Sequence, residues 1–481
     1  MPNGIPHEPR FFRHVGLLAG ASAIGPLVAF AAYPFLTRIF DPGQFGVLGL
    51  FEAVLAISLS FCTLRYHLAI PVADDDLDAA SLVAVSIASS GAVAVLLAIV
   101  LHWTQDFAVS NLRLSSIRHL TWLLPVATFA SGSALALAGW HTRRRAFARI
   151  AASRICQGLV QVSVQTAVGL MGMLQSGLAL GLVAARVAAG LVLCGRTDLG
   201  PPMRRVSWPN LVAATKRHRR LPLISSWSAI INILGQQLSV LIVGASFGVD
   251  AVGFYSLAFL VTVGPAHLVS QAIEQSFVAR MRDAEREGRT AALAYSVYRS
   301  LVRMGTVPAI VFAALAPDLF SVAFGQTWSL AGEFARWLVP SVLAAIVGSH
   351  LPSLVVLRHW QRAELVFNVA LASSRCVALL WAGNAVGPFA GVLAYGVTGA
   401  ILTLGYSASL IVAEGARIRD VAVPLLKETV SGLAIGGGLL GVRAVLGDAG
   451  SSTACAIGLV VVALHLALAI PRRASVAAMP G

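Results

Sequence analysis

The chain has 481 residues, of which 57% are apolar and 12% are charged, and its mean hydropathy is +0.80. A typical soluble protein carries about 25% charged residues, so this chain has too little charge to cover a water-soluble globule of its size. The formal net charge of +14 would suggest nucleic-acid binding in a soluble protein. In a polytopic membrane protein it indicates basic cytoplasmic loops beside anionic lipids, so we expect no nucleic-acid partner.

Long apolar stretches recur along the whole chain. A membrane-spanning helix requires roughly 20 apolar residues. Fourteen stretches satisfy this requirement, at residues 15–36, 45–64, 79–101, 120–140, 150–170, 176–195, 222–243, 251–273, 300–324, 334–357, 365–383, 388–413, 429–446 and 453–470. The sequence therefore predicts an all-α polytopic membrane protein with about 14 transmembrane helices.

The basic residues fix the orientation of these spans. With the N-terminus in the cytoplasm, 27 of the 35 lysines and arginines fall on the cytoplasmic side and 5 on the opposite side. The other three, Arg186, Arg303 and Arg375, lie inside spans. Because cytoplasmic loops are enriched in Lys and Arg, this asymmetry predicts that both termini are cytoplasmic.

A short corner between the first two spans returns later in the chain. "FDPGQFGVLGL" from Phe40 aligns with "FGVDAVGFYSL" from Phe247, which places Gly46 on Gly253, 207 residues later. A second pair, "AASR" ending at Arg154 and "ASSR" ending at Arg375, lies in the fifth and eleventh spans. These matches predict an N-lobe at 1–195, a basic cytoplasmic linker at 196–220, a C-lobe at 221–413, and two further spans with a short tail at 414–481. Two lobes around a central site are typical of alternating-access transporters.

Four segments carry a family resemblance. They are "LTRIFDPGQFGVLGLFEA", "LRYHLAIPVADDDLDAASLVAVS", "GWHTRRRAFARIAASRICQ" and "KRHRRLPLISSWSAIINILGQQLSVLIVGASFGVDAVGFYSLA". In these segments the chain resembles bacterial polysaccharide flippases of the multidrug/oligosaccharidyl-lipid/polysaccharide exporter superfamily, in order from about Phe11 to Arg419. The resemblance implies a flippase that moves an undecaprenyl-diphosphate-linked oligosaccharide across the bacterial inner membrane for O-antigen or exopolysaccharide synthesis. One departure is His67, which stands where the family often has an acid.

Polar side chains follow single faces of two predicted spans. In the fifth span the residues are Arg154, Gln157, Gln161 and Gln165, and in the seventh they are Ser225, Ser228, Asn232, Gln236 and Ser239. Their spacing places each set on one side of a helix. Such stripes either line a polar cavity or join helices by hydrogen bonds. We interpret them as cavity lining and expect Gln157, Gln161 and Gln165 on one wall and Asn232 and Gln236 on the other.

Charged residues inside the bilayer are costly and usually face a cavity or a partner. Arg186 and Arg375 therefore either bind a substrate diphosphate or form salt bridges with an acid. Glu52, and Glu274 near the cytoplasmic end of the eighth span, are the candidate coupling or salt-bridge acids.

The sequence contains no recognisable catalytic or metal-binding motif, so we expect a transporter without a cofactor or a bound metal rather than an enzyme. A cation-coupled drug or metabolite antiporter of the same superfamily, a membrane glycan polymerase or ligase, and a non-transporting scaffold remain as alternatives. The partners expected from the resemblance are a lipid-linked oligosaccharide and anionic membrane lipids. Polysaccharide polymerase or chain-length machinery are candidate protein partners.

Overall fold

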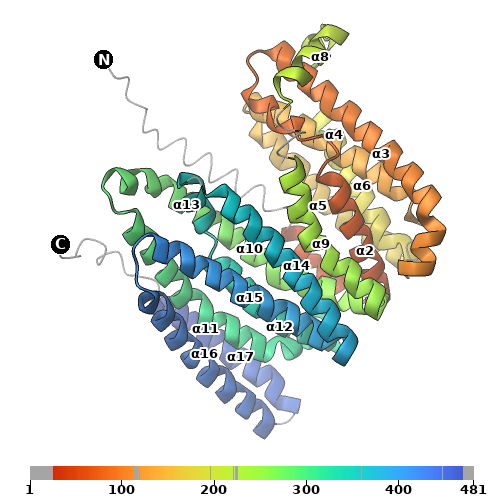
Figure 1. Ribbon diagram of the computed structural model, residues 1–481. Helices are drawn as coiled ribbons and strands as arrows, with labels where there is room; N and C mark the ends of the chain where they lie inside the picture. The colour runs from red at the N-terminus through yellow and green to blue at the C-terminus, as the bar shows by residue number, and fades with distance from the viewer. Residues whose placement is uncertain are drawn as a thin grey trace. The chain divides into compact units, whose positions relative to one another are not determined.

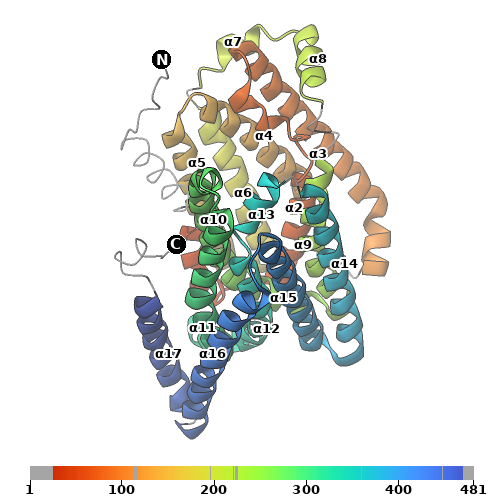
Figure 2. The ribbon, with the colours of Figure 1, turned by 60° about the vertical axis from the view of Figure 1, so that its left-hand side comes forward.

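The computed structural model describes residues 25, 27–112, 118, 120–195, 197–219, 222, 226–358, 360–446 and 448–469. All regular elements within these residues are helices, which confirms the predicted all-α class (Figures 1 and 2). Eleven of the described helices are long and apolar enough to cross a membrane, and two shorter apolar helices cover Leu27–Leu36 and Ile233–Phe247. The chain is therefore a multi-pass membrane protein, and fourteen spans remain the predicted number.

The contacts divide the chain into two compact units, with the boundary after Val252. In the first unit, the helix Leu27–Leu36 is followed by α2 (Pro42–Leu59), two 3-10 turns, η1 (Tyr66–Leu68) and η2 (Ile70–Val72), α3 (Asp76–Leu112), α4 (Leu123–Arg143), α5 (Phe147–Leu170), α6 (Leu174–Cys194), α7 (Gly200–Arg204), α8 (Trp208–Arg217) and α9 (Ser226–Phe247). In this unit α5 packs on α6, α3 packs on α4, and α9 packs on α2.

The second unit contains the remaining helices. They are α10 (Val249–Arg286), which begins just before the boundary, α11 (Thr290–Phe324), η5 (Gln326–Trp328), α12 (Ser329–Val347), α13 (Leu351–Leu357), α14 (Gln361–Val386), α15 (Pro388–Ala413), α16 (Ile418–Leu446) and α17 (Asp448–Ala469). Helix α11 packs on α12, α16 and α17, and α14 packs on α15. Figure 2 shows α16 and α17 as neighbours at the end of the chain.

Element starts recur along the chain at two intervals, one equal to the 207 residues of the sequence repeat and one seven residues longer. Helix α10 begins 207 residues after α2, and both α14 and α15 begin 214 residues after α5 and α6, respectively. The contacts nevertheless group α9 with the first unit, because this helix packs on α2. The lobe boundary within the basic linker, at 196–220, therefore remains a prediction from the repeat.

One predicted span is interrupted. The stretch 334–357 was expected as a single helix, but α12 ends at Val347 and α13 begins at Leu351. Pro352 lies in the first turn of α13, where its missing N–H costs nothing, whereas the same residue inside a continuous helix would remove a backbone hydrogen bond. This proline explains why the chain turns at Gly348 instead of continuing.

The repeated corner is a helix start with a complete cap. The backbone N–H of Gln44 donates to Asp41 Oδ1 at 2.9 Å, and the N–H of Asp41 donates to Gln44 Oε1 at 2.8 Å. Pro42 occupies the first helical position, where its fixed φ favours the helix. This reciprocal capping box satisfies two backbone donors and allows α2 to restart within a few residues of the preceding helix.

The two repeated corners touch each other. A Cβ atom on Gly46 would lie 2.8 Å from the carbonyl carbon of Val249 and closer still to its oxygen, and a Cβ on Gly43 would lie 2.8 Å from Asp250 Oδ1. On the other side of this contact, a Cβ on Gly244 would lie 2.9 Å from Leu50 Cδ2. Glycine permits such close approach between membrane helices, so α2 meets the backbone at the start of α10, and the Leu50 side chain of α2 packs on Gly244 of α9.

Helices α10 and α11 form a long hairpin. They contain 38 and 35 residues and are joined through a turn at Gly288, whose φ is +66°. Phe277 and Met281 of α10 pack against Ala294 of α11, which holds the two helices together near the turn. At 1.5 Å per residue the helices are about 57 and 52 Å long.

Candidate functional site

Four polar side chains from four helices come within electrostatic range of one another in the first unit. Tyr33 lies on Leu27–Leu36, Glu52 on α2, Arg154 on α5 and Arg186 on α6. Glu52 interacts electrostatically with Tyr33 and with Arg186, and Arg186 also interacts with Arg154. We call these four residues the N-unit polar cluster.

The charges of the N-unit polar cluster are close but not directly paired. Among the described residues, none of the four side chains forms a hydrogen bond, or an ion pair within 4.0 Å. Glu52 and Arg154 are exposed and Arg186 is half-buried, although the neighbours Phe51 and Ala53 are fully buried. Water can therefore reach the side chains of Glu52 and Arg154. Of the two alternatives for Arg186, a direct salt bridge to Glu52 is not formed.

The polar stripe of α5 divides into two parts. Gln157 and Gln161 are half-buried, and they continue the exposed face of Arg154 along the helix. Gln165 is only 2% exposed, and its Nε2 donates to the backbone carbonyl of Leu178 on α6 at 3.0 Å. Gln165 therefore joins two helices, whereas the three residues before it on the stripe remain accessible.

The stripe of α9 is only partly described. Ser225 and the side chains of Ser228 and Asn232 lie outside the described residues. Gln236 is exposed and takes part in an interaction, and the hydroxyl of Ser239 donates to the backbone carbonyl of Gln236 at 2.7 Å. A substrate role for Asn232 and Gln236 remains a prediction.

Arg375, on α14 in the second unit, is held by neutral groups. Its Nη2 donates to Ser341 Oγ at 2.5 Å, and its guanidinium carbon lies 5.2 Å from the ring centre of Tyr395, within cation–π range. A Cβ on Gly399 would lie 2.6 Å from the same carbon, so only glycine leaves room for this arginine. The Nε of Arg375 is buried without a hydrogen-bond partner among the described residues. No carboxylate of the described chain pairs with it.

The second unit contains two acids that interact with each other. Glu274 on α10 and Glu364 on α14 are both half-buried and lie within electrostatic range. Glu364 also interacts with Tyr406 on α15, whose ring stacks on Phe367 at 4.0 Å. Sequence reasoning selected Glu274 but missed Glu364, because the two residues are brought together only by helix packing.

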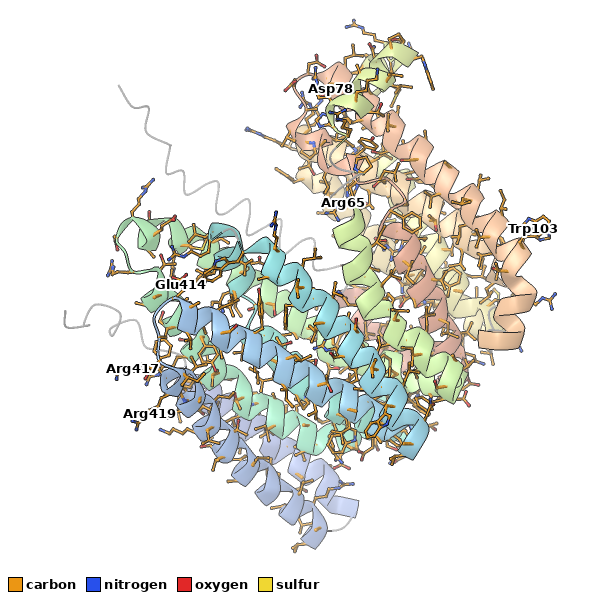
Figure 3. The ribbon with its side chains drawn as sticks, in the orientation of Figure 1. Arg65, Asp78, Trp103, Glu414, Arg417 and Arg419 are labelled. Carbon is orange, nitrogen blue, oxygen red and sulfur yellow. The ribbon has the colours of Figure 1, made fainter. Side chains whose placement is uncertain are left out.

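Ion pairs attach the linker helix α8 to the first unit. Arg217, at the end of α8, lies 2.7 Å from Asp74 and 3.5 Å from Asp78, and His218 lies 3.6 Å from Asp78. At the same end of α3, Asp76 pairs with Arg143 at 3.2 Å and with Arg144 at 2.9 Å. Figure 3 shows Asp78 and Trp103 near opposite ends of α3. The acidic run "DDD" thus neutralises part of the basic charge predicted to be cytoplasmic.

His67 lies in η1, between α2 and α3, and is a neutral residue. Its Nδ1 lies 2.5 Å from Thr63 Oγ1, and burial, together with the positive charge of Arg65, lowers the pKa of His67 to about 4. The imidazole is therefore uncharged at neutral pH. If relatives use the negative charge of an acid at this position, His67 cannot supply that charge.

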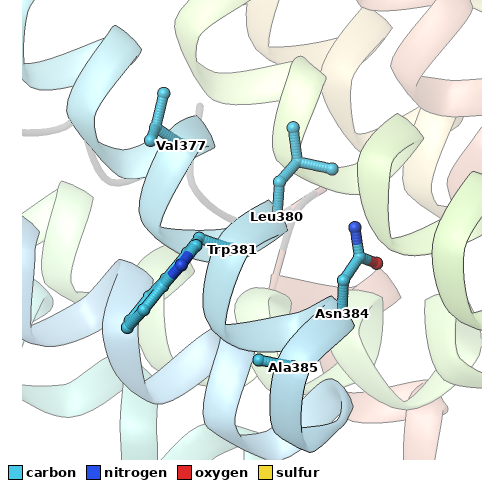
Figure 4. A pocket seen from close by; sticks show the side chains of 5 residues that line it. All are labelled: Val377, Leu380, Trp381, Asn384 and Ala385. Carbon is cyan, nitrogen blue, oxygen red and sulfur yellow. The ribbon is translucent and has the colours of Figure 1, made fainter.

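A hollow of about 520 Å³ lies on the surface of α14 (Figure 4). Its lining residues, Val377, Leu380, Trp381, Asn384 and Ala385, all belong to α14. Trp381 and Val377 are 76% and 64% exposed, as expected for a helix face in contact with lipid tails. This hollow contains none of the predicted site residues and does not suit a charged substrate.

Multiple apolar helices, with charged side chains of the first unit among them, define a multi-pass membrane protein. Its fold is similar to that of a lipid II flippase, MurJ, in an inward closed conformation, with a TM-score of 0.71 and 10% identity over 94% of this chain and 98% of that chain. It is also similar to an inward-facing multidrug resistance MATE transporter of the MOP superfamily, with a TM-score of 0.59 and 13% identity over 82% of this chain and 98% of that chain. No curated protein matches the chain.

A family model described as "Polysaccharide biosynthesis protein" matches residues 35–332. The chain belongs to this family, which confirms the resemblance to polysaccharide flippases seen in the sequence.

Proposed function

We propose that the protein is a flippase that translocates an undecaprenyl-diphosphate-linked oligosaccharide across the bacterial inner membrane by alternating access. The product would serve O-antigen or exopolysaccharide synthesis. The proposal is carried by the N-unit polar cluster, in which two arginines, one exposed and one half-buried, have no direct anionic partner among the described residues. Membership of the polysaccharide biosynthesis family and the MurJ-like fold support it.

The chemistry of the cluster suits a diphosphate. Each guanidinium presents a planar fork of donors that can bind phosphate oxygens in a bidentate manner. Gln157 and Gln161, which lie one and two turns from Arg154 on α5, offer amide donors and acceptors to sugar hydroxyls. In the second unit, Arg375 and the partly described α9 stripe are the further candidates for substrate contact.

A cation-coupled antiporter of drugs or metabolites is the second candidate function. The observation that favours it is the pair of half-buried acids, Glu274 and Glu364, together with the MATE-like fold. Such a protein would bind cations at these acids and would not require the arginines of the N-unit polar cluster. A catalytic role as a glycan polymerase or ligase has no support from any described constellation, and we expect transport alone.

The deciding experiment measures flipping in proteoliposomes with a fluorescent diphosphate-linked oligosaccharide lipid. We expect Arg186→Ala and Arg375→Ala to abolish translocation while the protein still accumulates in the membrane. Arg375→Lys should restore it only in part, because lysine lacks the fork of guanidinium donors. Arg419→Ala, at an exposed position in the first turn of α16, is the matched control and should translocate at the wild-type rate. Wild-type translocation by both Arg186→Ala and Arg375→Ala would contradict the proposal.

A further inference from the structure

Arg303 lies inside a predicted span but belongs to neither of the polar sites described above. It is on α11, three residues after the predicted start of its span at residue 300, and its side chain is exposed. At 1.5 Å of rise per residue, the backbone of Arg303 is about 5 Å inside the span. A charged residue within a span is costly and usually has a partner, so an exposed arginine at this depth calls for one.

The surface around Arg303 is apolar and exposed. Its Nη2 donates to the backbone carbonyl of Leu468, near the end of α17, at 3.5 Å, and the side chain of Leu468 is 77% exposed. Leu464, one turn earlier on α17, is 60% exposed. Large exposed apolar side chains on a spanning helix are expected where the helix meets lipid tails. The guanidinium of Arg303 therefore lies on a lipid-facing surface of the second unit.

The backbone of Arg303 is fixed, whereas its side chain is weakly held. The Nε2 N–H of His465 on α17 donates to the carbonyl of Arg303 at 2.8 Å, because a carbonyl oxygen can only accept. The contact between Arg303 and Leu468 is at the outer limit of a hydrogen bond, and the guanidinium has no other partner among the described residues. Most of its N–H donors therefore remain available to a ligand.

A second arginine lies one turn away on the same face of α11. Arg299 precedes Arg303 by four residues, and its side chain is also exposed. Side chains at this spacing are neighbours on a helix, and two like charges there destabilise it. Neither arginine lies within 4.0 Å of a carboxylate in the part of the chain that the structure describes. An anion bound between the two guanidinium groups would remove their repulsion.

The acids of the adjoining helices do not supply this anion. The only acid of α11, Asp318, is about 22 Å along the helix from Arg303, and it pairs with Arg443 at 3.0 Å. The only acid of α17, Asp448, is its first residue, at the end far from His465. The two acids of α16 form no ion pair with either arginine. The anion must therefore come from outside these three helices.

We propose that Arg299 and Arg303 bind the phosphate of an anionic phospholipid, in the leaflet on the side predicted to be cytoplasmic. The phosphodiester carries one negative charge, and the forks of donors on the two guanidinium groups match its oxygens. The long side chain of Arg303 reaches from its backbone toward the head groups, and the acyl chains lie against Leu464 and Leu468. This lipid is a resident of the site and is distinct from a transported substrate, so the inference does not depend on the proposed flippase function.

Native mass spectrometry of the purified full-length protein tests the site. The probes are dioleoylphosphatidylglycerol, which is anionic, and dioleoylphosphatidylcholine, which has the same acyl chains and no net charge. We expect the wild type to prefer phosphatidylglycerol on the order of tenfold, and Arg299→Gln and Arg303→Gln each to weaken its binding about fivefold without changing phosphatidylcholine binding. Arg303→Lys should retain part of the preference, because lysine keeps the charge but lacks the fork.

Arg280→Gln is the matched control, because Arg280 is an exposed arginine on α10, another long helix of the second unit. It should bind phosphatidylglycerol as the wild type does. Equal binding of the two lipids by the wild type, or equal weakening by Arg280→Gln and Arg303→Gln, would overturn the site, since binding would then reflect acyl chains or net charge alone. Displacement of the lipid by inorganic phosphate would also overturn it in favour of a free anion. The wild-type comparison of the two lipids decides the matter even if a variant fails to fold.

Discussion

The contact between the two corners can be tested by adding one methyl group. In Gly46→Ala, the new Cβ would lie 2.8 Å from the carbonyl carbon of Val249, whereas ordinary van der Waals contacts of a Cβ begin near 3.4 Å. Helix α2 must therefore move away from α9 and the start of α10 by roughly 1 Å. Overpacking of this kind costs about 1–3 kcal/mol. Because α2 is helical whether the corner is open or closed, the higher helix propensity of alanine cancels between these states, and the closed corner loses about 1–3 kcal/mol relative to the open one.

The matched control is Gly437→Ala. Gly437 lies within α16 with open space around its Cβ position, so the same substitution meets no atom there and should stabilise the helix by about 0.5–1 kcal/mol. The two variants contain the same chemical change, but their effects on thermal stability in detergent should have opposite signs.

The assay for corner opening is cysteine labelling. Val252 is fully buried beside Gly244, so Val252→Cys, in a chain whose five native cysteines are replaced, should react with a small impermeant thiol reagent only when the corners separate. A loss of about 1–3 kcal/mol changes the ratio of open to closed corners about 5- to 150-fold, and Gly46→Ala should speed labelling by a factor in that range. Equal labelling rates in Gly46→Ala and Gly437→Ala, with equal melting temperatures, would refute the close contact.

Three further outcomes are expected. Arg286→Cys should be labelled by an impermeant reagent from the cytoplasmic side only, and labelling from outside would reverse the predicted orientation. Burial keeps the pKa of His67 near 4, below its unfolded value near 6.5, so the unfolded chain binds more protons than the folded chain between these two pH values. The melting temperature should therefore fall as the pH is lowered from 6.5 to 4, and His67→Gln should show a smaller fall. Arg358→Ala removes the two hydrogen bonds, of 2.6 and 2.7 Å, to the carboxylate of Glu414, whose side chain is 5% exposed, and should lower the free energy of unfolding by about 1–3 kcal/mol. Arg358→Ala combined with Glu414→Gln should recover stability. An unchanged stability of the single variant would exclude a stabilising pair.

Helices and corners were predictable because each depends on neighbouring residues. Apolar length defines the spans, and Asp41, Pro42 and Gln44 contain the whole capping box within four residues. The break before Pro352 had a local signal as well, since proline is poorly tolerated inside a helix. The continuous span over 334–357 was predicted because apolar composition was weighed above that proline.

Partners across helices were not predictable from the sequence. The even spacing of the α5 stripe gives no indication that Gln165 is buried against Leu178 while Gln157 remains accessible. Arg375 was selected from the sequence as a charge inside a span, but Ser341 and Tyr395 are 34 and 20 residues away along the chain, and only packing brings them to its guanidinium. Helical periodicity assigns a residue to a face without saying which helix that face meets.

The length of the α10–α11 hairpin determines how far the protein reaches from the bilayer. A helix of about 57 Å exceeds the roughly 30 Å hydrocarbon core, so about 20 Å or more of the hairpin extends past the lipid tails on the side predicted to be cytoplasmic. The turn at Gly288 is then farther from the lipid head groups than the Debye length of about 8 Å, and its charges are screened from the membrane surface. An affinity tag or fluorophore inserted at this turn would stand clear of the detergent belt and could report on the protein without touching a membrane-spanning helix.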